Sequence, residues 1–224
     1  MKQATSKLLI VDSNPEPLAE TLSDEGYEVC TANNGIDAYK AAKKEQADLI
    51  LLDIMLPGMD GIELCEKLRD NKQFDHTFIV VLTERNESYS EIASFEAGAD
   101  GYIAKPIKTR VLTARLKAIL NRRSYNNNPT VKKIGNITID NKNHIIKQNN
   151  EEIKLTQKEY ELLLLLSSKV CKVFSRKLIY EKIWGDGLWV GGRTIDVHIR
   201  KLRSKIGKEY IKTFKGIGYK LIAP

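Results

Sequence analysis

Short, mostly apolar runs recur in the first half of the chain, and each ends at a polar or charged residue. They cover Leu8–Val11, Leu49–Leu52, Phe78–Leu82 and Gly101–Ala104. Runs that are apolar at successive positions are typical of strands buried on both faces of a parallel sheet. Because helical patterns alternate with these runs, the first half is expected to form a parallel α/β sheet.

The residues that end these runs are chemically related. Asp12, Asp53, Thr83 and Lys105 follow the four runs in order. The carboxyl ends of parallel strands open into the crevice in which such sheets bind ligands. Paired carboxylates can hold Mg²⁺, and an aspartate oxygen can accept a phosphoryl group as an acyl phosphate. One such residue alone would indicate a solvated side chain or a helix cap, but four together favour a phosphoryl-transfer site with Asp53 as the reactive group.

The second half has a different pattern. Two β-like stretches come first, at 134–140 and 143–147. Thr156 followed three residues later by Glu159 predicts a capping box at the start of a helix whose core is Tyr160–Leu166. A further helix is expected from Ser175 to Trp184, where glycines stop it.

A third helix, from Arg193 to Gly207, is both amphipathic and basic. Its apolar stripe consists of Ile195, Ile199, Leu202 and Ile206. The opposite side is expected to present Arg193, Thr194, Val197, Arg200, Lys201 and Ser204, with His198, Arg203 and Lys205 on its flanks. Such a helix alone is more often a solvated surface, but cations and donors around a small apolar residue also fit a DNA major groove.

The segment after this helix favours the DNA interpretation. Stretches 210–214 and 218–222 flank Lys215-Gly216-Ile217 and predict a terminal hairpin. A hairpin beside a basic helix can act as a wing that reaches the neighbouring backbone or minor groove with Lys215.

Charge divides the chain in the same place as the pattern. Residues 1–123 hold 16 Lys and Arg against 20 Asp and Glu, and the remaining residues hold 20 against 9, so the net charges are −4 and +11. A strongly basic half indicates a polyanionic partner. Between the halves, the polar stretch Arg122–Thr130 is typical of a linker. We predict domains at 1–121 and 132–224 with a linker at 122–131.

Composition adds three expectations. No apolar run approaches the roughly 20 residues of a membrane span, and the N-terminus lacks a signal-peptide core, so we expect a cytoplasmic protein with no membrane partner. The cysteines Cys30, Cys65 and Cys171 are far apart and have apolar neighbours, and are expected to be buried thiols. Neither a disulfide framework nor a zinc motif is present.

Residues 7 to about 120 resemble the receiver domain of bacterial two-component response regulators. The resemblance is carried by Asp12, the Asp53–Gly61 segment, Thr83, the Glu96–Tyr102 run and Lys105-Pro106. It implies a flavodoxin-like doubly wound parallel sheet, with Asp53 as the phosphoacceptor of a sensor histidine kinase. It further implies that Thr83 and Tyr102 are switch residues, that Lys105 contacts the phosphoryl group, and that Mg²⁺ is held by Asp12, Asp53 and the carbonyl of Met55.

The sequence departs from this family at two places. Ser13 stands where receivers usually carry a second acid, which implies weaker Mg²⁺ binding. On the face after Thr83, through which family members pair, Glu91, Gly101 and Val111 replace a base and two acids, whereas Arg115 and Arg122 remain. The resemblance therefore implies a homodimer through that face with altered contacts.

Residues 132–224 resemble the α+β winged helix-turn-helix domain of the OmpR/PhoB class of response regulators. The matching segments are Arg193–Ile199, Leu202-Arg203 and Thr213–Tyr219. The resemblance implies that double-stranded promoter DNA is the partner and that bases are nearest to Thr194, Val197 and Lys201. It implies phosphate contacts for Arg176, Trp184, Arg193, His198, Arg200, Arg203, Thr213 and Tyr219. Trp184 is equally explained as core, and the loop with Trp189 is a candidate contact for RNA polymerase.

The sequence thus predicts a DNA-binding transcriptional response regulator controlled through Asp53, and not an enzyme. One alternative is a phosphorylation-independent, constitutively dimeric regulator, which Ser13 favours. Another is an aspartyl-phosphate phosphatase, but that chemistry usually needs an acid two residues after the nucleophile, where this chain has Met55.

Overall fold

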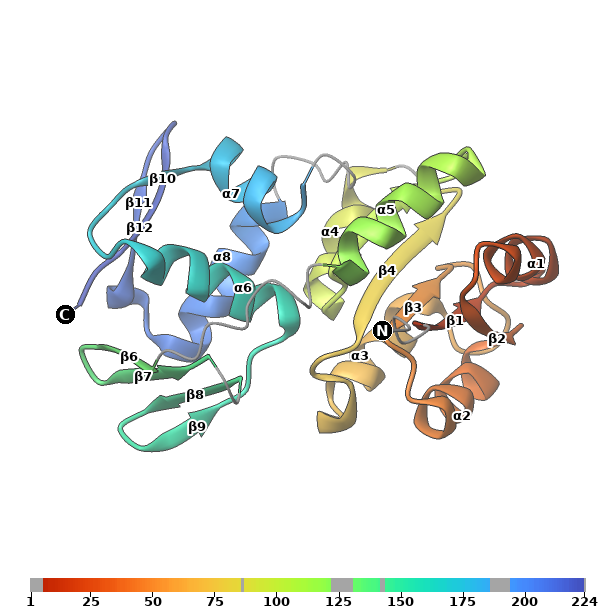
Figure 1. Cartoon of the computed structure of the whole chain (residues 1–224), viewed down its shortest axis with the longest axis horizontal. Coiled ribbons are helices and arrows are strands. Elements are labelled where there is room, and N and C mark those ends of the chain that lie inside the picture. Colours follow the sequence, from red (N-terminus) through yellow and green to blue (C-terminus); the bar gives the residue numbers. More distant parts are fainter. Residues whose placement is uncertain (1–5, 86, 122–130, 142–143, 186–193, 224) are drawn as a thin grey trace. The chain divides into compact units, whose positions relative to one another are not determined.

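The computed structural model describes residues 6–85, 87–121, 131–141, 144–185 and 194–223. These residues form two compact units, the first ending at Leu120 and the second beginning at Asn121. Figure 1 shows a sheet flanked by helices in the first unit, and a cluster of helices with small sheets in the second.

The first unit is a five-stranded parallel sheet. Its strands are β1 (Lys7–Val11), β2 (Glu28–Ala32), β3 (Leu49–Leu52), β4 (Phe78–Thr83) and β5 (Gly101–Ala104), in the order β2-β1-β3-β4-β5. The connecting helices are α1 (Glu16–Asp24), α2 (Gly35–Glu45), α3 (Gly61–Arg69), η1 (Lys72–Phe74), α4 (Ser88–Ala97) and α5 (Thr109–Asn121). This is the flavodoxin-like architecture that the sequence predicted, so that prediction is confirmed.

Strand register aligns the ends of the central strands. Every residue of β3 and β4 is buried, as the continuous apolar runs predicted. Val11 lies opposite Leu52, so Asp12 and Asp53 follow at the same edge. The backbone extends this alignment by one residue, because the Asp53 amide donates to the Val11 carbonyl (2.8 Å). The two carboxylates are therefore neighbours because of register.

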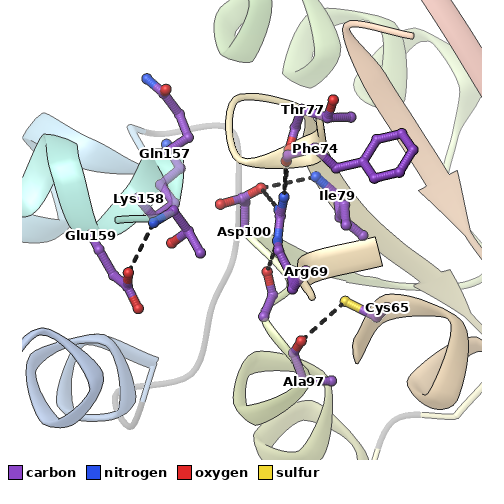
Figure 2. A network of polar contacts seen from close by, with 12 residues as sticks. Cys65, Arg69, Phe74, Thr77, Ile79, Ala97, Asp100, Gln157, Lys158 and Glu159 are labelled. Carbon is purple, nitrogen blue, oxygen red and sulfur yellow. Dashed lines mark hydrogen bonds and ion pairs between the residues drawn. The ribbon is translucent and has the colours of Figure 1, made fainter. Parts of the chain in front are cut away.

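Arg69 anchors the opposite end of the same unit (Figure 2). Its guanidinium donates to the carbonyls of Gly98 (2.9 Å), Phe74 (2.6 Å) and Thr77 (3.0 Å), and pairs with Asp100 at 2.7 Å. Both side chains are almost fully buried, with 8% and 2% exposed. The contacts fix the end of α3 to the turns that precede β4 and β5.

The second unit combines two small antiparallel sheets with three helices. The first sheet contains β6 (Val131–Ile134), β7 (Ile137–Asp140), β8 (Ile145–Gln148) and β9 (Glu151–Ile153), in sequence order. The helices are α6 (Gln157–Ser168), α7 (Arg176–Ile183) and α8 (Thr194–Ile206), with η3 (Lys208–Tyr210) after them. The second sheet pairs β10 (Phe174–Ser175), β12 (Gly218–Leu221) and β11 (Ile211–Phe214) in that order. Helices α6, α7 and α8 followed by the terminal hairpin of β11 and β12 make this unit a winged helix.

Local signals placed the helices of this unit better than its strands. The capping box is confirmed, since the Thr156 amide donates to the Glu159 carboxylate at 2.9 Å. The single stretch expected at 134–140 was wrong: Ile134 ends β6, a turn with Gly135 at φ +57° follows, and Ile137 begins the antiparallel β7. The expectation of buried thiols is confirmed for Cys65, but Cys30 is half-buried and Cys171 is exposed in the turn before β10. Its apolar neighbour Val170 is itself 40% exposed.

Candidate phosphoacceptor site and nucleic-acid interface

The structure brings Asp12, Asp53 and Lys105 together at the carboxyl edge of the sheet. The Lys105 Nζ lies 2.5 Å from an oxygen of Asp12 and 2.7 Å from an oxygen of Asp53. The side chains are 24%, 16% and 8% exposed for Lys105, Asp12 and Asp53. A cation between two largely sequestered carboxylates neutralises one of their two charges and marks the place where a further cation or a phosphoryl group would bind.

Local backbone geometry holds Asp53 in this position. Its second oxygen accepts a hydrogen bond from the Met55 amide at 3.1 Å. Gly61, at the start of α3, lies so close that a side chain there would collide with the Asp53 carbonyl. A glycine is therefore required if the helix is to begin directly beside the end of β3.

The carboxylates open into a cleft of about 440 Å³. It is lined by Asp12, Ser13, Asn14, Pro17, Leu18, Asp53, Met55, Glu84 and Lys105. Within the described ranges, no group of three or more histidine, cysteine, aspartate or glutamate side chains could hold a metal ion. The cleft still fits a hard cation, because Mg²⁺ is usually held by only one or two carboxylates and keeps several waters.

The charge of Lys105 is secured by its partners. Burial lowers the pKa of the ammonium, but the hydrogen bonds to Asp12 and Asp53 together with their charges outweigh it, so the net pKa is raised above the ordinary lysine value. The group is thus a fixed positive charge at neutral pH.

Thr83 and Tyr102 are joined through one backbone segment. Thr83 is fully buried, and its hydroxyl oxygen accepts from the Arg85 amide at 3.4 Å. The Tyr102 hydroxyl donates to the carbonyl of the same Arg85. Burial, followed by the charges of Glu87 and Glu91, raises the pKa of Tyr102 to about 12, so its hydroxyl remains a donor. Arg85 was missed from the sequence, since no side-chain pattern signals a backbone link.

In the second unit, the apolar stripe of α8 is confirmed as core. Ile195, Ile199, Leu202 and Ile206 are each 3% exposed or less. Among the cations and donors expected opposite, Arg200 and Ser204 are exposed and Lys201 is half-buried. The helix therefore has the two-sided character that its pattern predicted.

Trp184 and His198 require correction as expected phosphate contacts. Both are buried, at 1% and 2% exposed, and their rings lie 5.3 Å apart. His198 stands three residues after Ile195 and four before Leu202, a spacing that places it on the same helix side as the stripe. These two side chains belong to the core of the unit.

Two of the residues expected nearest the bases are also buried. Thr194 is 1% and Val197 8% exposed, whereas the sequence placed both on the outer side of α8. Thr194 lies one turn before His198 and shares its side of the helix. The helix pattern does not account for the burial of Val197. Arg193 and Trp189 lie outside the described residues.

Four of the remaining expected phosphate contacts form two hydrogen-bonded pairs. Arg176 and Tyr219 meet, with 3.0 Å between the Arg176 Nη2 and the Tyr219 hydroxyl. Arg203 donates to the Ile211 carbonyl at 2.6 Å and to the Thr213 hydroxyl at 2.8 Å. At the tip of the wing, Lys215 is exposed. The set therefore spans the start of α7, the helix α8 and both strands of the terminal hairpin, β11 and β12.

Two family models match separate parts of the chain. Residues 8–117 match the family described as response regulator receiver domain, and residues 150–221 match transcriptional regulatory protein, C terminal. The transcriptional regulatory protein SrrA of Staphylococcus aureus is 37% identical over 232 residues, which cover 96% of this chain and 95% of that protein.

Solved structures are similar along the whole chain. A mutant form of RitR is 30% identical, covers 98% of this chain and 100% of its own, and has a TM-score of 0.78. The response regulator DrrB of Thermotoga maritima, described as an OmpR/PhoB homolog, is 30% identical and covers 97% and 99%, with a TM-score of 0.50. No helix in the described residues is long and apolar enough to cross a membrane. The chain belongs to the OmpR/PhoB-type response regulators of two-component systems, in which a receiver domain is followed by a DNA-binding transcriptional regulatory domain.

Proposed function

We propose that a sensor histidine kinase phosphorylates this regulator on Asp53 and thereby controls its dimerisation and promoter binding. The observation that carries the proposal is the Lys105 ammonium within 2.7 Å of both carboxylates at the strand ends. That arrangement provides a nucleophilic oxygen and a fixed cation beside it. Both are needed for transfer of an anionic phosphoryl group.

In the transfer, an oxygen of Asp53 forms a bond to phosphorus while the bond between phosphorus and the donor nitrogen breaks. That nitrogen belongs to the phosphohistidine of the kinase. The electron pair of the broken bond remains on its imidazole, which takes up a proton. Asp12, Asp53 and the Met55 carbonyl would hold Mg²⁺, which shields the phosphoryl oxygens when bound. Lys105 then exchanges its contact with the Asp53 carboxylate for one with a phosphoryl oxygen.

The new charge is read through Arg85. Before phosphorylation, the Thr83 hydroxyl accepts a hydrogen bond from the Arg85 amide. A phosphoryl oxygen on Asp53 would attract this hydroxyl and weaken that bond. Movement of that backbone alters the acceptor of the Tyr102 hydroxyl, because it is the carbonyl of the same residue. The surface of α4, β5 and α5 therefore responds to phosphorylation.

We infer that this surface forms the homodimer. Tyr89 on α4 and Val111 on α5 are 62% and 42% exposed, which supplies apolar area in place of the charged pairs usual in the family. Pairing of two receivers raises the effective concentration of two winged helices on adjacent half-sites.

We assign the DNA contacts to the exposed or half-buried members of the predicted set. These are Arg176, Arg200, Lys201, Arg203, Thr213 and Lys215. Tyr219 was expected to contact phosphate but is 3% exposed, and its hydroxyl is hydrogen-bonded to Arg176 and Asp196, so we assign it the role of holding Arg176. Thr194 and Val197 reach bases only if their surroundings change on binding. The net charge of +11 beyond residue 123 supports phosphate binding by this unit.

The first experiment measures phosphate incorporation. The purified protein is incubated with acetyl phosphate and Mg²⁺ beside Asp53→Ala, with Glu84→Ala as a control that removes an exposed acid from the same cleft. Incorporation that is lost only in Asp53→Ala, and that increases dimerisation, supports the proposal. Incorporation that persists in Asp53→Ala overturns the assignment.

Ser13 supports a second candidate, a phosphorylation-independent regulator that dimerises constitutively, because it lines the cleft at the position where receivers usually carry a second acid. It predicts no incorporation, with dimers and DNA binding unchanged by Asp53→Ala.

DNA binding has its own test. The logarithm of the affinity should fall with the logarithm of salt concentration by about 0.9 per phosphate contacted. A flat response would contradict the assigned interface.

A further inference from the structure

Asp196 is the only acidic residue in α8, the helix that carries most of the cations expected to face DNA. Its side chain is 48% exposed in the first turn. A carboxylate on such a surface should repel phosphates, and neither the sequence pattern nor the proposed contact set gives it a role. Its contacts indicate what it does.

The carboxylate of Asp196 joins three elements of the unit. One oxygen lies 3.2 Å from the Arg176 Nε, at the start of α7. The same oxygen accepts a hydrogen bond from the Tyr219 hydroxyl on β12 at 2.5 Å. Since Arg176 also donates to that hydroxyl, the three side chains form a closed triad.

Tyr219 in turn lies between two cations. The guanidinium carbon of Arg176 is 4.9 Å from the centre of its ring, and that of Arg203 is 5.8 Å away. Burial, followed by the hydrogen bond to Asp196, raises the pKa of Tyr219 to about 12, so the hydroxyl keeps the proton that it donates. Holding this ring in place therefore orients both guanidinium groups.

The orientation leaves donors for a ligand. Within the described part of the chain, Nη1 of Arg176 has no acceptor, and its side chain is 33% exposed. Arg203 is anchored by the Ile211 carbonyl and the Thr213 hydroxyl, both of the wing. Two guanidinium groups held in one place lose less conformational freedom on binding phosphate than two mobile ones.

We propose that Asp196 is a positioning residue for DNA binding, which holds Arg176 and Tyr219 so that α7, α8 and the wing offer one phosphate-binding surface. The inference rests on the proposed DNA contacts of this unit. If Asp196 only repelled phosphates, its removal would strengthen DNA binding. The positioning role predicts the reverse, because removal of the carboxylate weakens DNA binding although the protein becomes more positive.

The test compares Asp196→Ala, Asp196→Asn and Glu181→Ala in the full chain. Glu181 is an acid on the adjacent helix with a similar exposure, 45%, and among the residues that the structure describes it pairs with Lys177 at 3.9 Å. Its removal changes the net charge equally without touching the triad. Affinity for a duplex is measured over a salt series, and the tryptophan fluorescence of each variant in urea checks that the unit folds.

Because Asp196→Ala loses one part-exposed ion pair and one hydrogen bond, its affinity for the duplex should be about 3- to 10-fold lower than that of Glu181→Ala. The salt slope should decrease by about one phosphate contact. Asp196→Asn keeps an acceptor for Tyr219 and should lie between Asp196→Ala and the wild type. The inference would be overturned if Asp196→Ala binds the duplex as tightly as Glu181→Ala, or more tightly. If Asp196→Ala does not fold, tighter binding by Asp196→Asn than by the wild type would overturn it. Absence of salt-dependent binding by the wild type would instead count against the proposed DNA interface.

Discussion

Lys105→Met removes the only cation that the structure places between Asp12 and Asp53 in the described residues. The ammonium contacts their oxygens at 2.5 and 2.7 Å, and the methionine side chain fills similar space without charge. Two carboxylates with 16% and 8% exposure would then repel each other in one cleft. We expect the receiver to lose stability, and the cleft to bind a cation more tightly.

The size of the loss follows from burial. Removing one partner of a fully buried ion pair costs about 3–5 kcal/mol, and an exposed pair contributes about 0–1 kcal/mol. Because Lys105 is 24% exposed, we expect an intermediate loss of about 2–3 kcal/mol in the unfolding free energy. Mg²⁺ at 100 times its Kd would raise the unfolding free energy by about 2.7 kcal/mol, since it binds only the folded site.

The measurement must report on the receiver alone. Both tryptophans lie in the second half of the chain, so their fluorescence follows the winged helix. Deuterium uptake by β1 and β3 peptides across a urea series, in EDTA and in MgCl₂, follows the receiver instead. Lys117→Met is the matched control, because Lys117 is 53% exposed in its pair with Glu25. It should change stability by less than about 1 kcal/mol, independently of Mg²⁺.

Two results would refute the reasoning. If Lys105→Met is as stable as the wild type in EDTA, the ammonium does not neutralise the carboxylates. If the variant is destabilised but Mg²⁺ stabilises it no more than the wild type, the two carboxylates do not form the cation site.

Three further predictions concern single side chains. Arg69→Met should lower the unfolding free energy of the receiver by about 3–5 kcal/mol, because it leaves Asp100 buried without its cation; a loss below 1 kcal/mol in the same deuterium experiment would contradict this. Ser13→Asp should tighten Mg²⁺ binding and speed phosphorylation by acetyl phosphate, because it adds a charge to the cleft; unchanged Mg²⁺ titrations would show that position 13 does not reach the cation. The folded pKa of Tyr219, about 12, exceeds the ordinary 10.0, so its proton favours the folded state fully below pH 10 and this stability is lost as pH rises towards 12. Tyr219→Phe should therefore show a shallower alkaline loss of stability by tryptophan fluorescence, and an unchanged slope would exclude that contribution.

The strands and helices that build the phosphoacceptor site were legible in the sequence. Uninterrupted apolar runs specify doubly buried strands, and a polar residue directly after each run must lie at the same edge if the strands are parallel. For this reason Asp12, Asp53, Thr83 and Lys105 were found together without any structure.

The interface of the winged helix was only partly legible. Helical periodicity identified the stripe from Ile195 to Ile206. It could not show whether the residues beside this stripe, such as His198, are exposed or buried. His198 and Trp184 have polar atoms and occur beside cations, so their residue types favoured a DNA contact. The packing of their rings against each other, which joins α7 to α8, placed them in the core.

By itself, the sequence determined the two folds, the charge division and the candidate phosphoacceptor carboxylate, because each depends on periodicity and residue type over short stretches. Only the tertiary structure decided how side chains distant in sequence share hydrogen bonds. The Arg85 backbone between Thr83 and Tyr102, and Asp196 between Arg176 and Tyr219, are such links. The hydrogen bond from Tyr102 to Arg85 and those from Arg176 and Tyr219 to Asp196 span 17 to 23 residues of the chain, and a local pattern cannot specify hydrogen bonds over such separations.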